Sequence, residues 1–184
     1  SFMHLRAGVE FLFENLEMER RRVIFPKYIC GSVVRAAERA GIKVNYCEVN
    51  SEGHIDIEEL KKMPLKDYGA VFFVRTFGNK GEVEKISELC EKNKLFLIED
   101  CAHSFKVEKT FGNFVLFHFA KRLANSHGGI LISEGIDFPK LKKKAFFFDG
   151  LIPVILKIGI VRPILNLYRT TKKMPLDNDE NNDK

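Results

Sequence analysis

The chain has 184 residues, of which 45% are hydrophobic and 30% charged, with a formal net charge of +5. This composition suits one domain with a hydrophobic core and excludes a disordered chain. The four cysteines form no CxxC motif and are too sparse for a disulfide scaffold, so we expect a reducing, cytoplasmic location.

Hydrophobic periodicity predicts alternating helices and strands along most of the chain. In chain order we expect a helix over 6–19, a strand over 22–25, a helix over 31–40, a strand over 43–49, a helix over 56–62, a strand over 70–75, a helix over 81–93, and strands over 95–99, 114–119 and 129–133. This alternation is typical of an α/β fold. We therefore predict three layers, with a mostly parallel sheet and helices on both of its faces.

Positive charge is concentrated in two stretches, 20–22 and 140–144. Neither stretch has the interleaved aromatic residues of a single-strand binder, and no zinc-finger or RNP pattern occurs. We expect a solvated basic surface and no nucleic-acid partner, with nucleic-acid binding as the minor alternative. Cys101 and His103 have no second ligand pair nearby in the sequence, so no metal site is predicted.

The stretch LFLIEDCAHSF at 95–105 ends an apolar strand on two acids, Glu99 and Asp100. In open α/β sheets, ligands bind beyond the carboxyl ends of the strands, so an acid at this position is a candidate ligand contact. The alternatives are a solvated loop acid or the cap of a following helix.

Five stretches resemble, in the same order, motifs of the DegT/DnrJ/EryC1/StrS family. They are RVIFPKYICGSVVRAAERAGIKVNYCEVN, EGHIDIEEL, AVFFVRTFGN, LFLIEDCAHSF and FHFAKRLANSHGGIL, within about residues 4–134. Each motif is weak alone, and the resemblance depends on their common order. The family consists of pyridoxal-phosphate (PLP) aminotransferases that act on nucleotide sugars, so the resemblance implies PLP and the large domain of the fold type I PLP-dependent transferases.

The resemblance also implies roles for three residues. Asp100 would face the pyridine nitrogen of PLP, His103 would lie beside its phenolic oxygen, and Lys121 would form the Schiff base with its aldehyde. Successive strand residues face opposite ways, so Glu99 would point away from Asp100, toward a structural partner. The alternatives are a helix-capping or half-buried imidazole for His103, and a surface lysine on a turn for Lys121.

The other predicted cofactor contacts depart from the family pattern. Arg6 lies in His4-Leu5-Arg6-Ala7, where the family has a glycine-containing turn that binds the phosphate at a helix start. Cys30 lies where the family often stacks an aromatic ring on PLP, and His118 replaces a serine that contacts the phosphate. These departures call the affinity for PLP into question.

The largest departure from the family is length. Family members carry a second, smaller domain that completes the substrate site, whereas this resemblance ends near residue 134 and the chain at residue 184. We therefore expect a large domain over 1–134, an apolar and basic helical segment over 135–170 and a disordered tail over 171–184, with the small domain missing.

Residues 145–168 are apolar but interrupted by charges and prolines, and no charge-free run in them is long enough to span a bilayer. Three interpretations remain open. The segment packs on the sheet or on a partner subunit, lies in a membrane interface, or is an exposed apolar patch of a shortened chain. The expected partners are a second copy or a longer homologue, with peripheral membrane attachment as the alternative.

Two functional hypotheses follow. The first is a PLP-dependent aminotransferase-like protein related to keto-sugar aminotransferases, with a nucleotide sugar and an amino donor such as glutamate as substrates. The second is a catalytically impaired or truncated relative that acts as a binding or assembly module. Asp100 and Lys121 favour the first, whereas the altered phosphate cradle and the missing small domain favour the second.

Overall fold

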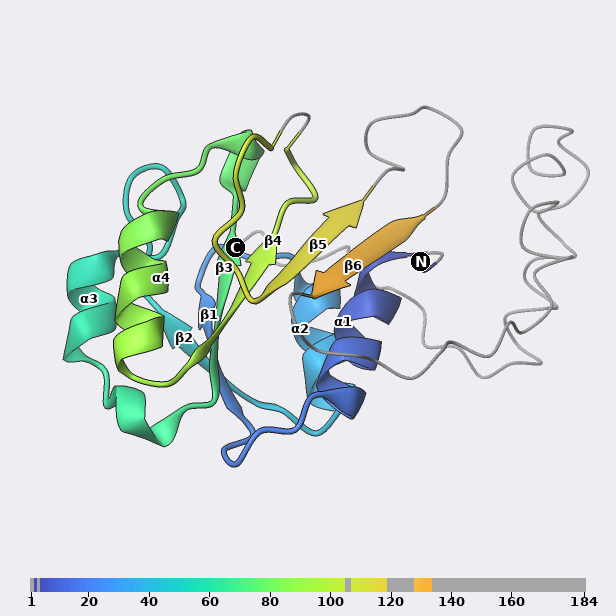
Figure 1. Ribbon diagram of the computed structural model, residues 1–184, viewed down its shortest axis with the longest axis horizontal. Helices are drawn as coiled ribbons and strands as arrows, with labels where there is room; N and C mark the ends of the chain where they lie inside the picture. The colour runs from blue at the N-terminus through green and yellow to red at the C-terminus, as the bar shows by residue number, and fades with distance from the viewer. Residues whose placement is uncertain (1, 3, 105–106, 119–127, 134–184) are drawn as a thin grey trace, which may run out of the picture. The chain divides into compact units, whose positions relative to one another are not determined.

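The computed structural model describes residues 2, 4–104, 107–118 and 128–133. In this part of the chain six strands form one sheet in the order β2-β1-β3-β4-β5-β6 (Figure 1). The strands are β1 (Arg22–Pro26), β2 (Lys43–Cys47), β3 (Ala70–Val74), β4 (Phe96–Asp100), β5 (Phe114–His118) and β6 (Gly129–Ser133). β1 to β5 run parallel and β6 is antiparallel to β5, which confirms the predicted mostly parallel sheet.

Helices cover both faces of the sheet, as the alternating pattern predicts (Figure 1). They are α1 (Leu5–Asn15), α2 (Gly31–Arg39), α3 (Ile57–Lys62) and α4 (Val83–Lys92), with short 3-10 turns at Leu65–Asp67 and Thr76–Gly78. The apolar residues of α1 and α2 pack on one face, against Phe25, Phe72 and Ile98 among others. Those of α3 and α4 pack on the other face, against side chains that include Phe73 and Leu97.

The sheet has a hydrophobic core on each of its two faces because successive side chains of a strand point in opposite directions. Neighbouring residues point to opposite faces, so Phe72 joins one core and Phe73 the other, and both are completely buried. Burying each such side chain contributes about 1.5–3 kcal/mol relative to exposure. A strand that is apolar on both faces must lie between two layers of helices, which is why the 70–75 run predicted a buried strand.

The predicted elements are confirmed, with boundaries that differ by a few residues. The first helix ends at Asn15 rather than at residue 19, because Leu16 already has extended backbone angles. α3 begins after Asp56, whose carboxylate accepts the backbone N–H groups of Glu58 and Glu59 at 2.8 and 3.2 Å. β4 runs one residue past its predicted end and includes Asp100, because this residue still pairs with β3 and β5.

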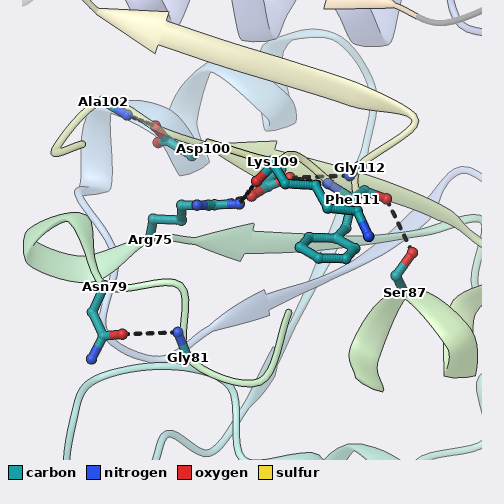
Figure 2. A network of polar contacts seen from close by, with 10 residues as sticks. Arg75, Asn79, Gly81, Ser87, Asp100, Ala102, Lys109, Phe111 and Gly112 are labelled. Atoms are coloured by element: carbon teal, nitrogen blue, oxygen red, sulfur yellow. Dashed lines mark hydrogen bonds and ion pairs between the residues drawn. The ribbon is translucent and has the colours of Figure 1, made fainter. Parts of the chain in front are cut away.

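A buried ion pair at the carboxyl edge of the sheet connects the end of β3 with β4 (Figure 2). The guanidinium of Arg75 contacts the carboxylate of Glu99, and it also donates to the carbonyl oxygen of Lys109 at 2.6 Å. The second carboxylate oxygen of Glu99 accepts the N–H groups of Phe111 and Gly112 at 2.9 and 3.0 Å. Glu99 therefore holds the segment that leads into β5, which confirms the prediction that it points away from Asp100 toward a structural partner.

None of the helices within the described residues is long and apolar enough to cross a membrane. The predicted segments 135–170 and 171–184, and with them the apolar stretch 145–168, lie outside the described residues. Their boundaries and roles stay predictions.

Candidate cofactor site at the carboxyl edge of the sheet

A cavity of about 370 Å³ opens at the carboxyl ends of the parallel strands. Its walls include Tyr28, which follows β1, Val74 at the end of β3, Asp100 at the end of β4 and His118 at the end of β5. Its volume is within the ~300–1,000 Å³ typical of small-molecule sites. The strand order changes direction between β1 and β3, and doubly wound sheets bind their ligands at such a switch point.

Asp100 lines this cavity from the end of β4, and Figure 2 shows its carboxylate directed toward Ala102. The residue is 5% exposed, and its Oδ1 accepts the N–H of Ala102 at 2.8 Å. Its backbone carbonyl accepts the N–H of Arg75 at 2.9 Å, which ties β4 to the end of β3. Asp100 shares the sheet face of Ile98, on the side covered by α1 and α2, while Glu99 faces the other side.

The N-termini of two helices also reach the cavity. His4, Leu5 and Arg6 line it at the start of α1, and Cys30 and Ser32 line it at the start of α2. The first N–H groups of a helix have no intrahelical acceptor, and the helix dipole is positive there, so this wall favours an anion such as a phosphate. Leu5 lines the cavity and is also part of the hydrophobic core.

The cavity brings together all the predicted cofactor contacts that the structure describes. These contacts are Arg6, Cys30, Asp100, His103 and His118, and they come from the starts of α1 and α2 and from the ends of β4 and β5 or the loop that follows β4. The remaining predicted residue, Lys121, lies outside the described residues. The roles of all six residues stay predictions, because proximity to one cavity does not assign an atom of a ligand to each.

Several wall residues were not predicted from the sequence, and Tyr28, Val74 and Thr76 are three of them. A signal for two of them was present, because Val74 and Thr76 come at the end of the predicted strand 70–75. The rule that drew attention to Asp100, that ligands bind beyond the carboxyl ends of strands, applies equally to this neighbouring strand. Tyr28 carried no comparable signal beyond following the strand-ending proline.

Comparison with known proteins agrees with this geometry. The DegT/DnrJ/EryC1/StrS aminotransferase family matches residues 7–149. A UDP-4-amino-4,6-dideoxy-N-acetyl-beta-L-altrosamine transaminase of Campylobacter jejuni is 27% identical over 139 residues, covering 70% of this chain and 37% of the transaminase. This chain therefore spans little more than a third of the length of that relative.

Solved structures show the same fold. Helicobacter pylori PseC, an aminotransferase of pseudoaminic acid biosynthesis, matches 72% of this chain and 38% of its own with a TM-score of 0.63 at 20% identity. An E. coli GDP-4-keto-6-deoxy-D-mannose-3-dehydratase with bound hydrated PLP matches 71% of this chain and 38% of its own with a TM-score of 0.62 at 19% identity.

The sheet, its two helical layers and the cavity at its carboxyl edge define the large-domain fold of the fold type I PLP-dependent transferases. The chain belongs to the DegT/DnrJ/EryC1/StrS aminotransferase family. This match confirms the family that the sequence motifs indicated. The aminotransferases of this family are PLP-dependent, which confirms the cofactor predicted for the family.

Cys30 offers a direct test of the cavity. It is exposed at the cavity wall, whereas Cys47, Cys90 and Cys101 are buried. Burial raises the pKa of Cys47 to about 11 and that of Cys90 to about 12, so both stay protonated and unreactive near neutral pH. We expect a thiol reagent such as Ellman's reagent to label one cysteine of the folded chain quickly and the other three only on unfolding.

The control is Cys30→Ser, which should remove the fast phase and leave the slow phase unchanged. Absorbance at the wavelength of the released thiolate measures both phases. A fast phase that persists in Cys30→Ser would show that one of the buried cysteines is accessible in solution, and it would contradict the packing described here.

Proposed function

We propose that this chain is the PLP-binding large domain of an aminotransferase-like protein related to those that aminate the keto group of nucleotide sugars. One observation carries the proposal. Residues from the start of α1, the start of α2 and the ends of β4 and β5 converge on one cavity, and they include the positions at which the resemblance to the family places cofactor contacts. Family membership supports the same reading.

The residues of the cavity fit PLP chemically. A buried carboxylate such as Asp100 stabilises a protonated pyridine nitrogen, because a charge with little access to water needs an opposite charge near it. The helix N-termini at Arg6 and Cys30 suit the phosphate group, and the guanidinium of Arg6 can pair with it. The volume of about 370 Å³ is that of a site for a small molecule.

PLP supplies an electron sink when it is bound, and the protein supplies binding, orientation and proton transfer. In this proposal Asp100 would hold the proton on the ring nitrogen and His103 would orient the phenolic oxygen. Arg6 and His118 would bind the phosphate, and Cys30 would lie against the ring. The amine of Lys121 would hold the cofactor and move the proton during amino transfer from a donor such as glutamate.

A titration with PLP tests the proposal. We expect PLP to give the wild-type chain a visible absorbance band that borohydride reduction converts into a stable covalent adduct on Lys121. Lys121→Ala should lose the adduct while its circular dichroism and unfolding midpoint stay those of the wild type. Peptide mass spectrometry locates the adduct.

Arg122→Ala is the matched control, because Arg122 is the neighbouring cation and a guanidinium cannot attach the aldehyde. It should retain the adduct. An adduct that maps to another lysine would remove Lys121 from the site, and a chain that binds no PLP at millimolar concentration would reject the proposed cofactor.

The second candidate is a binding or assembly module without activity, which pairs with a second copy or with a longer homologue. One feature favours it: the resemblance places Leu5 where the family has the glycine of its phosphate-binding turn, and a side chain at that position would leave a phosphate less room than glycine does. The same titration separates the candidates. A chain that folds but shows neither the band nor the adduct supports the module.

A further inference from the structure

Phe77 adopts a backbone conformation that a bulky residue rarely adopts. It lies in the turn Thr76–Gly78 after β3, with φ 52° and ψ 21°. Among the described residues only Lys94 shares a positive φ without being glycine. A left-handed conformation crowds the Cβ atom against the backbone, so it persists only where the surrounding structure enforces it.

Burial does not explain this conformation. Phe77 is 80% exposed, which makes it the most exposed of the large hydrophobic residues in the described part of the chain. A phenylalanine gains free energy mainly by leaving water, and here most of that gain is absent. Packing in the hydrophobic core therefore does not account for the strained backbone of Phe77.

The ring of Phe77 stacks on the imidazole of His103. The two ring centroids are 6.2 Å apart and the planes are inclined by 17°, an offset parallel arrangement. His103 lines the cavity three residues after Asp100. Phe77 is not among the residues that line the cavity, but its ring stacks on the side chain that the resemblance assigns to the phenolic oxygen of the cofactor.

The turn that carries Phe77 is held by one hydrogen bond to a neighbouring loop and closed by a second within the turn. Thr76 Oγ1 donates to the carbonyl oxygen of Gly53 at 3.0 Å, and the N–H of Gly78 donates to the carbonyl oxygen of Arg75 at 3.0 Å. A Cβ atom at Gly78 would lie only 3.2 Å from the carbonyl oxygen of His103, so this glycine lets the turn pack directly on the backbone of His103. The ring of Phe77 and the imidazole are therefore held in register.

We propose that Phe77 is a positioning residue for His103, and that its strained backbone keeps the aromatic ring over the imidazole. The stack restricts rotation of the imidazole and fixes the direction in which its nitrogens meet a ligand in the cavity. The role in cofactor binding rests on the proposed function, whereas the effect on the imidazole itself does not.

Phe77→Gly gives the sharpest test, because glycine accepts the left-handed backbone without strain and removes only the ring. The unfolding midpoint of this variant should equal or exceed that of the wild type. At the same time the NMR couplings that report the side-chain rotamer of His103, on signals assigned with His103→Asn, should become those of an averaged, freely rotating side chain, an effect that the loss of the ring current alone does not produce. The affinity for PLP should fall by about threefold or more. A merely structural role predicts the opposite sign for stability.

Lys94→Gly is the matched control, since Lys94 has φ 56° in the turn before β4 and is absent from the cavity wall. It should change the midpoint in the same direction and leave both the His103 couplings and the PLP affinity unchanged. Phe77→Tyr keeps an aromatic ring and should preserve both. In a His103→Ala background, Phe77→Gly should have no further effect on PLP affinity.

Unchanged His103 couplings in Phe77→Gly would overturn the proposal, as would an equal loss of PLP affinity in the His103→Ala background. A wild-type chain that binds no PLP would reject the proposed function but not this inference, because the NMR couplings of the chain without PLP still decide whether Phe77 positions His103.

Discussion

Glu99→Ala is expected to lower the free energy of unfolding by about 3–5 kcal/mol, the usual loss when one partner of a buried ion pair is removed. Glu99 is completely buried and Arg75 is 4% exposed, so the variant leaves a guanidinium charge with little access to water. The N–H groups of Phe111 and Gly112 lose their acceptor in the same step. Denaturant unfolding followed by circular dichroism measures the loss.

Two variants separate charge from hydrogen bonding. Glu99→Gln keeps an oxygen that can accept the two N–H groups but loses the charge, so its loss should be smaller than that of Glu99→Ala. In the double variant Arg75→Ala with Glu99→Ala, the loss of unfolding free energy should be less than the sum of the two single losses. Each single variant leaves the other charge buried without its partner, whereas the double variant leaves no unpaired charge of this pair.

Lys61→Ala is the control on the surface. Its ammonium lies 2.7 Å from the carboxylate of Glu58, but both side chains are at least half exposed, and solvent weakens their attraction. The expected loss is only about 0.2–1 kcal/mol. A loss from Glu99→Ala no larger than this one would mean that the charge is not buried in solution.

Asp100→Asn is expected to slow the half-reaction of the PLP-loaded chain with glutamate by about 10²–10³-fold, the scale observed when one preorganised electrostatic group is removed from an active site. Asparagine keeps an oxygen for the N–H of Ala102, so the local fold is preserved. Only the charge that would hold the proton on the pyridine nitrogen is lost. The change of the visible absorbance band after addition of glutamate measures the rate.

Covalent attachment should survive in Asp100→Asn and in Asp100→Ala, because it depends on the amine of Lys121. Borohydride trapping therefore provides the internal control for the loaded state. A half-reaction with wild-type rate in either variant would remove Asp100 from the catalytic site, and a loss of the adduct would assign it a role in binding alone.

Much of the fold could be predicted because its signals are local. The continuous apolar runs of 70–75 and 95–99 predict buried strands, and Gly41, with φ 78°, ends the second helix as expected. Because successive residues of a strand point to opposite faces, Glu99 and Asp100 are assigned to opposite faces of the sheet, and the buried contacts of Glu99 confirm its side. The acid at the carboxyl end of a strand predicts where the candidate site lies, and the burial of Asp100 at the cavity excludes the alternative of a solvated loop acid.

The tertiary structure alone decided which distant residues meet. The reversal of β6, the pairing of Phe2 with Gly129 and the partner of Glu99 depend on the register between strands far apart in the sequence. The convergence of Arg6, on the first helix, with His118, at the end of the fifth strand, likewise results from packing of a helix across the sheet. A local pattern gives the face of each element, but its neighbours are chosen by how the elements together bury their apolar faces, and no short stretch of sequence contains that choice.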